Sequence, residues 1–301
     1  MKRFSVDKKI SPRSAAACMM GCAFLWSTSG ALIKLIDWNG MVITCLRSLV
    51  AAAALCVYLR LLGKKLVLNR LTMTTAIAVC IKYICFVLGN KLTSSANMVA
   101  LQYTNPVFVL VISILIFHKK VKRKDILVAV ATAAGIAMLT LDHSGTSSAV
   151  GNLMGLAVGL TTSIMYLMSA RSASYEESLS IITLGHIYTA VLMSPFLFLS
   201  KITFTPQNVS SLLLLGLLQQ AVAYALFSFS TRSAPPLTCS LIACINPLLN
   251  PVWTAVLLHE IPGPVTIAGF VIVLGSITLW SVSNAKEKTK TLVEQDASLG
   301  C

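Results

Sequence analysis

Lys82 is the residue with the most specific chemical consequence in this chain, because it lies near the middle of an apolar stretch. A charge at the centre of a membrane span costs roughly 2.5–3.5 kcal/mol on insertion scales, so such a residue usually faces water, a partner or a ligand. The ammonium could bind a substrate carboxylate, or the neutral amine could take part in proton coupling. A third interpretation is that the long side chain reaches the membrane interface.

Aromatic and amide side chains in other apolar stretches could complete a binding site. Rings can cover the apolar part of a ligand, and amides can satisfy its polar groups. Packing or anchoring at the lipid interface explains any single one of them equally well. Together with Lys82, the candidate substrate-binding residues are Trp26, Tyr83, Tyr103, Asn105, Tyr166, Gln220, Tyr224 and Asn246.

Three Asn-Pro dipeptides interrupt the apolar stretches. A proline has no backbone N–H and frees a carbonyl group, and irregular helix at membrane depth is tolerated only where it lines a cavity or is packed in protein. We therefore interpret Pro106, Pro247 and Pro251 as candidate gating positions or helix breaks. A packing kink is an equally good interpretation of the same residues.

The other ionisable residues give weaker signals. Arg47 is close enough to one end of its apolar stretch for us to interpret it as snorkelling, and the isolated His186 fits an interhelical hydrogen bond better than proton coupling. No carboxylate is predicted at mid-depth to relay protons or Na⁺, which favours a facilitator or exchanger over a tightly coupled pump. The acidic residues all lie at span ends, in loops or in tails: Asp7, Asp37, Asp125, Asp142, Glu176, Glu177, Glu260, Glu287, Glu294 and Asp296.

The composition determines the elements that must hold these residues. With 56% hydrophobic and 11% charged residues, the chain cannot cover a soluble globule, whose sequence is about 25% charged. Its apolar runs are long enough to cross a bilayer as helices. The sequence predicts an all-α membrane protein with ten transmembrane helices, at 14–36, 40–61, 71–90, 95–117, 125–142, 150–169, 178–199, 209–230, 235–258 and 264–282.

The net charge of +14 reports membrane topology rather than nucleic-acid binding, because the basic residues sit in short loops. With a cytoplasmic N-terminus, the outside connections hold only Lys91 and Lys201 of the 24 Lys and Arg residues. Both termini are therefore predicted to be cytoplasmic, as segment 1–13 and a disordered tail 283–301. The nine cysteines lie mostly in apolar runs and form no CxxC pair, so we expect no disulfide, metal site or cofactor.

An internal repeat supports the ten spans. The pattern Asn-Pro-x₁₁-His occurs at Asn105 and again at Asn246, an offset of 141 residues that also carries Tyr83 onto Tyr224. Five spans separate the two copies, and an odd number of crossings makes the second copy enter from the opposite face. The sequence thus predicts two inverted five-helix repeats, 14–142 and 150–282.

Ordered short motifs resemble the drug/metabolite transporter superfamily, and in particular its ten-helix bacterial EamA-type members. The family often has Gly-Glu after the fourth span, where this chain has His118-Lys119. The resemblance implies a transporter of the bacterial inner (cell) membrane whose central cavity is lined mainly by spans 1, 3, 4, 6, 8 and 9. The motifs are Gly21, Trp26-Ser27, Arg47, Lys91–Ala96, Asn105-Pro106, Gly151–Leu153, Ala223-Tyr224, Asn246-Pro247, His259-Glu260, Gly269 and Gly275.

The expected function is transport of small polar metabolites, amino acids or related compounds, by alternating access through that cavity. One alternative is an exporter of drugs, nucleobases or other metabolites with proton coupling, and another is a non-transporting membrane scaffold or receptor. No GxSxG, HExxH or phosphate-loop motif supports an enzyme. We expect membrane lipids and a small-molecule substrate as partners, no nucleic acid, and a monomer or homodimer.

The predicted topology can be tested by cysteine labelling in intact cells, with the native cysteines replaced. A membrane-impermeant thiol reagent should label Ser144→Cys and Pro262→Cys and spare Lys122→Cys and Lys288→Cys. Labelling of Lys122→Cys from outside would overturn the topology.

Overall fold

The computed structural model describes residues 11–117, 123–141, 148–169, 174–233, 242–243, 245–259, 263–265, 267–276, 278–280 and 282–283. Those residues form helices joined by turns and short loops, without a β-strand among them. His118, the basic segment 119–122, Glu260, residues 1–10 and the tail from 284 onwards lie outside the described residues. The predictions made for them stay predictions.

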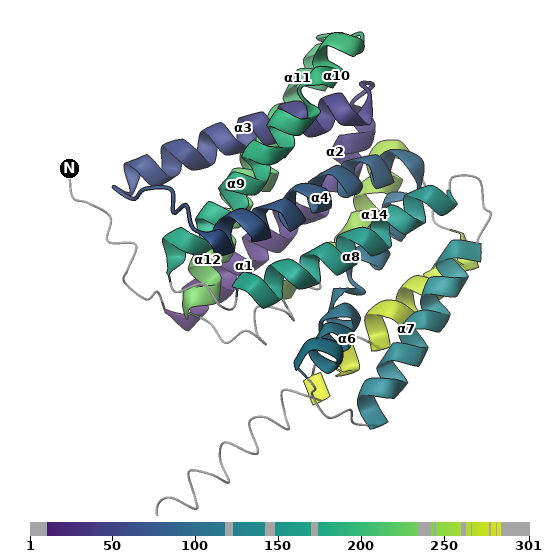
Figure 1. Ribbon diagram of the computed structural model, residues 1–301. Helices are drawn as coiled ribbons and strands as arrows, with labels where there is room; N and C mark the ends of the chain where they lie inside the picture. The colour runs from purple at the N-terminus through teal and green to yellow at the C-terminus, as the bar shows by residue number, and fades with distance from the viewer. Residues whose placement is uncertain are drawn as a thin grey trace, which may run out of the picture.

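The described helices follow the predicted spans (Figure 1). The first predicted span consists of α1 and α2. The second span is α3 and the third is α4, whereas the fourth is divided into α5 and α6. The bounds are α1 Pro12–Ser27, α2 Ser29–Leu35, α3 Gly40–Leu61, α4 Arg70–Leu92, α5 Ser95–Gln102, α6 Asn105–Phe117, α7 Arg123–Leu141, α8 Ala149–Ser169, α9 Tyr175–Met193, α10 Pro195–Leu199, α11 Pro206–Leu213, the π-helix η1 Leu214–Val222, α12 Ala223–Ser233 and α14 Ile245–Leu258.

Length and hydropathy identify membrane-crossing helices directly. Two shorter apolar helices, Ala149–Met165 and Ile267–Trp280, accompany five stretches that are long and apolar enough to cross a bilayer. Large apolar side chains are exposed along many of these helices, as contact with lipid requires. The protein is therefore an all-α membrane protein. The five long stretches are Arg13–Leu35, Gly40–Leu61, Arg70–Leu92, Tyr175–Leu199 and Pro206–Phe227.

Local sequence explains where the helices begin. The Asn69 side chain accepts a hydrogen bond from Thr72 N (2.8 Å), and the Thr72 hydroxyl accepts one from Asn69 N (3.0 Å), which is a capping box at the start of α4. Ser94 and Ser174 cap α5 and α9 in the same position. These caps satisfy backbone donors that no helical carbonyl can reach.

The first span contains a break that the sequence did not predict. Three consecutive hydroxyls bond back to the preceding turn: Ser27 to Phe24 O (2.6 Å), Thr28 to Leu25 O (2.8 Å) and Ser29 to Trp26 O (2.8 Å). Such back-bonding competes with the helical ladder and bends helices. It separates α1 from α2 at Thr28.

Packing between the halves shows the repeat in space (Figure 1). Adding 141 to the residue numbers of α4 gives 211–233, which covers η1, α12 and the last three residues of α11, and the same offset relates α1 to α8 and α3 to α9. α4 packs against α8 and α9, while α12 packs against α1 and η1 against α3. Each of these contacts thus has a counterpart between the corresponding helices of the two repeats. A two-fold relation between inverted five-helix repeats requires this pattern.

Contacts at the helix ends agree with the predicted alternation of sides. On the face predicted to be cytoplasmic, Asn69 Nδ2 donates to Glu177 (2.5 Å) and Trp280 Nε1 donates to Asp125 (2.8 Å). On the opposite face, Trp38 Nε1 donates to Thr203 O (2.8 Å). Each of these contacts joins span ends that the prediction puts on the same side.

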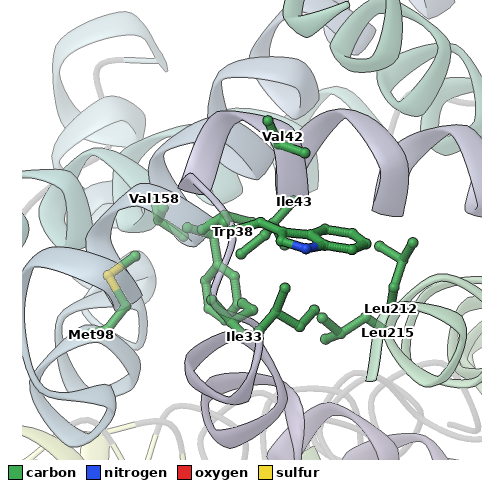
Figure 2. Close-up of a cluster of buried hydrophobic side chains, with 11 residues drawn as sticks. Ile33, Trp38, Val42, Ile43, Met98, Val158, Leu212 and Leu215 are labelled. Atoms are coloured by element: carbon green, nitrogen blue, oxygen red, sulfur yellow. The ribbon is translucent and has the colours of Figure 1, made fainter. Parts of the chain in front are cut away.

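A cluster of buried apolar residues surrounds Trp38 (Figure 2). It joins Ile33 and Trp38 to Leu212 and Leu215 from the other repeat, with Met98 nearby. The cluster therefore holds the two repeats together at the end of the bundle that carries Trp38.

Gly151 sets the closest approach of α8 to α4. A Cβ atom there would lie 2.9 Å from both Leu92 C and Thr93 N, which are backbone atoms and cannot turn away. We expect Gly151→Ala to lower the stability of the purified protein by about 1–3 kcal/mol through overpacking. The measurement is thermal unfolding in detergent.

Gly275→Ala is the matched control, since its new Cβ would meet none of the described atoms within 4 Å. Equal unfolding temperatures for the two variants would show that α4 and α8 are not in close contact.

Candidate functional site

A group of buried polar and aromatic residues lies where α3, α4, α9, η1 and α12 meet. We call this group the Lys82 cluster. Its members are Arg47, Lys82, Tyr83, His186, Gln220 and Tyr224. At its centre, the rings of Tyr83 and His186 stack with centroids 4.0 Å apart and planes 11° apart. Because α4 and α9 belong to different repeats, this stack crosses the repeat interface.

Lys82 lies inside the protein. Its side chain is 9% exposed, and its Nζ donates a hydrogen bond of 3.2 Å to the Tyr224 hydroxyl on α12. The same Nζ lies 5.9 Å from the ring centroids of both Tyr83 and Tyr224. This position fits the two interior interpretations of Lys82 and does not fit snorkelling to the lipid interface.

Arg47 requires a correction, because the prediction that it snorkels is wrong. Its side chain is 0% exposed. Among the described residues, none of its three guanidinium nitrogens has a hydrogen-bond partner. Its Cζ lies 5.7 Å from the Tyr83 ring centroid and 5.9 Å from that of Phe86. The guanidinium, which stays charged in proteins, thus belongs to the Lys82 cluster.

The interhelical hydrogen bond predicted for His186 has one candidate partner among the described residues, Gln220 on η1. Neither ring nitrogen has a hydrogen-bond partner of normal geometry in the part of the chain that the structure describes. Gln220 lies close enough to His186 to interact with it, and the ring packs on Tyr83. His186 therefore contacts two helices, η1 through Gln220 and α4 through its stack on Tyr83.

The π-helix η1 brings two adjacent glutamines into the protein. Gln219 and Gln220 are both buried, and Gln220 Nε2 donates to Gln219 Oε1 (2.8 Å). Gly216, one turn earlier, lets η1 approach α3 so closely that an added Cβ would lie 3.2 Å from Arg47 O. π-Helices are rare and occur frequently at functional sites. This one positions Gln220 beside the Lys82 cluster.

Trp26 joins the cluster through aromatic contacts. Its ring centroid lies 5.4 Å from that of Tyr224 and 5.5 Å from that of Phe227. The structure thus brings together Lys82, Tyr83, Trp26, Gln220 and Tyr224 of the predicted site. The side chain of Tyr166 lies outside the described residues.

The remaining predicted residues belong to the helix breaks. The carbonyl of Asn105, the first residue of α6, accepts a hydrogen bond from the Ser163 hydroxyl (2.7 Å). Asn246 is buried on α14, and its Oδ1 has no partner among the described atoms. Tyr103 lies between α5 and α6, and its hydroxyl donates to Ala243 O (3.0 Å).

A missing backbone donor explains the hydrogen bond from Tyr103 to Ala243. Pro247 lacks the N–H that would bond to the carbonyl four residues earlier, which is that of Ala243. The Tyr103 hydroxyl supplies a donor in its place. The break at the start of α14 is therefore stabilised by a residue from the break between α5 and α6, in the other repeat.

Pro251 lies inside α14, and its neighbours contact the break in the first span. Asn250 Nδ2 donates to Ser27 O (3.0 Å), and Trp253 Nε1 donates to the Ser27 hydroxyl (2.8 Å). The interruptions of the helices are thus linked in pairs across the repeats.

The four acidic residues that the structure describes, Asp37, Asp125, Glu176 and Glu177, lie at or near helix ends, as the sequence predicted. Asp125 and Glu177 are buried, but both lie in the first turns of α7 and α9, where Trp280 and Asn69 bind them. Glu176 pairs with Lys64 at the same end. Within the described residues, the Lys82 cluster holds two basic side chains and no carboxylate.

These features define a helical membrane protein of two repeats with a cationic cluster between them. The model of the EamA-like transporter family matches residues 13–141 and again residues 149–282. The chain belongs to this family, which confirms the resemblance seen in the sequence and makes the protein a membrane transporter of the drug/metabolite type.

A solved structure supports the fold. It is titled only "Crystal structure of protein" and aligns with a TM-score of 0.63 at 17% identity over 91% of this chain and 98% of its own. A search of curated proteins found no significant match.

The paired helix breaks give a prediction for Pro247. In Pro247→Ala the new N–H can bond to Ala243 O in competition with Tyr103, so α14 should lengthen and stiffen. We expect slower amide exchange across 243–251 and slower transport per folded molecule. Exchange followed by mass spectrometry and flux in vesicles measure the two effects.

Pro206→Ala is the control, because Pro206 is the exposed first residue of α11 and follows the extended cap residue Thr205, so an N–H there would have no helical partner. Unchanged exchange and flux in Pro247→Ala would make this proline a packing residue.

Proposed function

We propose that the protein carries small metabolites bearing a negatively charged group, amino acids or related compounds, across the membrane by alternating access. The observation that carries the proposal is the position of Lys82. Its ammonium is buried between the repeats with a neutral hydroxyl as its hydrogen-bond partner, and the family is one of transporters.

The charge of Lys82 supplies the physical argument. A buried ammonium without a counter-charge is costly, and charge-assisted hydrogen bonds to a carboxylate are among the strongest available to it. A substrate carboxylate would supply that counter-charge on entering the cluster. Lys82 therefore binds the anionic group of the substrate and favours anionic or zwitterionic molecules over cations.

The rings around Lys82 suit the rest of such a substrate. Trp26 and Tyr224 meet edge to face, and Tyr83 presents a ring to the same ammonium. Aromatic side chains give ligand sites their apolar area, with a few polar groups fixing orientation. In this proposal Tyr166 contributes as well, and Gln220 and Asn246 contribute side-chain amides, of which the Asn246 oxygen has no partner among the described atoms.

Alternating access would use the helix breaks. Breaks in one repeat are bonded to breaks in the other, at Tyr103 with Ala243 and at Ser27 with Asn250. A rocking motion of one repeat against the other would exchange these contacts. The described interior has no carboxylate relay, which favours a facilitator or exchanger over an ion-driven pump.

Two other functions remain candidates. Proton-coupled export of drugs or nucleobases would use Lys82 or His186 as the protonated group, and the burial of both side chains in the Lys82 cluster is the observation that favours it. A scaffold or receptor would produce no flux when the purified protein is placed in vesicles. A cell-membrane protein with cytoplasmic termini, monomeric or dimeric, fits all three.

The test begins with a thermal-shift screen of purified protein against amino acids, organic acids, nucleobases and cationic drugs, because a ligand of the folded state raises its melting temperature. We expect carboxylate-bearing ligands to stabilise the wild type. Lys82→Met should abolish this binding, and Lys82→Arg should retain part of it. Lys201→Met, at an exposed lysine, should behave as wild type.

Proton coupling through Lys82 predicts a different result for the same variant. Binding would then survive in Lys82→Met, while the pH dependence of flux would disappear. Normal binding and normal pH dependence in Lys82→Met would contradict both roles for this residue.

A further inference from the structure

Arg47 adds a second cation that the proposed function does not use. Its side chain is completely buried, and its Nε, Nη1 and Nη2 atoms lack hydrogen-bond partners among the described residues. A guanidinium presents five N–H donors in a rigid fork, and buried polar groups are nearly always hydrogen-bonded. The arrangement therefore lacks an acceptor for Arg47.

The rings beside Arg47 do not supply that acceptor. Tyr83 and Phe86 lie 5.7 Å and 5.9 Å from its Cζ and make cation–π contacts. Such contacts stabilise the charge and orient the guanidinium plane. They leave the hydrogen-bond donors at its edge unused.

Arg47 and Lys82 belong to one electrostatic unit. Both contact the Tyr83 ring, and both are close enough to His186 to act on it by their charge. The Tyr83 hydroxyl, which is buried, lies beside the Tyr224 hydroxyl that binds Lys82. The cluster is rich in donors and carries two positive charges, and its described part has no carboxylate to balance them.

From this arrangement we infer that Arg47 is a second anion-binding residue and that the site prefers small organic dianions, either dicarboxylates or phosphate monoesters, to monoanions and zwitterions. The inference rests on the proposed transport function and specifies its substrate class. A dianion balances both cations and accepts from both donor sets. A zwitterion brings its own ammonium, which Arg47 and Lys82 repel.

The experiment uses the full-length protein in detergent at fixed ionic strength. Thermal shift and titration calorimetry measure binding of succinate, glycerol 3-phosphate, propionate and glutamine. We expect at least one of the two dianions to bind at least tenfold more tightly than propionate or glutamine. Comparison of succinate with glycerol 3-phosphate shows whether carboxylate or phosphate is the preferred form of the dianion.

Variants then assign the preference to Arg47. Arg47→Met should reduce dianion affinity at least tenfold and propionate affinity by a smaller factor, which narrows the discrimination. Arg47→Lys should keep part of it because the charge remains. Arg60→Met is the control, since Arg60 is exposed near the end of the same helix.

Two results would overturn the inference. One is equal affinity of the wild type for dianions, propionate and glutamine, a measurement that does not depend on whether any variant folds. The other is an unchanged dianion preference in Arg47→Met. Lys82-dependent binding of propionate or glutamine without a dianion preference would leave the proposed function standing, whereas no binding and no flux for any anion would contradict both.

Discussion

Two positive charges buried without a carboxylate beside them are the constraint on which the rest of this structure depends. Arg47 is fully buried and Lys82 nearly so, and the described acidic residues lie at helix ends. A globular core would remove such charges or pair them, because an unpaired buried ion costs several kcal/mol. A transporter can retain them when the counter-charge arrives with the substrate. The charges are then part of a site that is complete only when it is occupied.

The fold places these charges between the two repeats. Arg47 and Lys82 come from the first repeat, while His186, Gln220 and Tyr224 come from the second. The same repeats also stabilise each other's helix breaks, with Tyr103 bonded to Ala243 and Asn250 bonded to Ser27. In the proposed mechanism, substrate binding and movement of the helix ends would therefore depend on the same interface.

The sequence predicted the helical membrane fold and the repeat because both follow from long-range patterns of composition and spacing. Lys82 could be identified because its distance from both span ends makes its charge costly wherever it points. Arg47 was misinterpreted, because depth in a span does not say whether a side chain faces lipid or protein. The sequence contains a second signal for a buried Arg47, since Arg47 and Lys82 are the two described Lys or Arg residues that lie well inside their helices. The π-helix at Gln220 and the bond from Tyr103 to Ala243 arise from tertiary packing, which local patterns do not encode.

The stability of the unliganded protein tests the central claim most directly. Replacing both cations with an apolar residue of similar length, in the double variant Arg47→Met/Lys82→Met, removes the unbalanced charges and leaves the volume nearly unchanged. If the cations are retained for a ligand, the double variant should be more stable than the wild type in the absence of ligand, by about 1–4 kcal/mol as for other buried ionic groups replaced by apolar ones. A double variant that unfolds at a lower temperature than the wild type would contradict the account, because the two charges would then stabilise the fold itself.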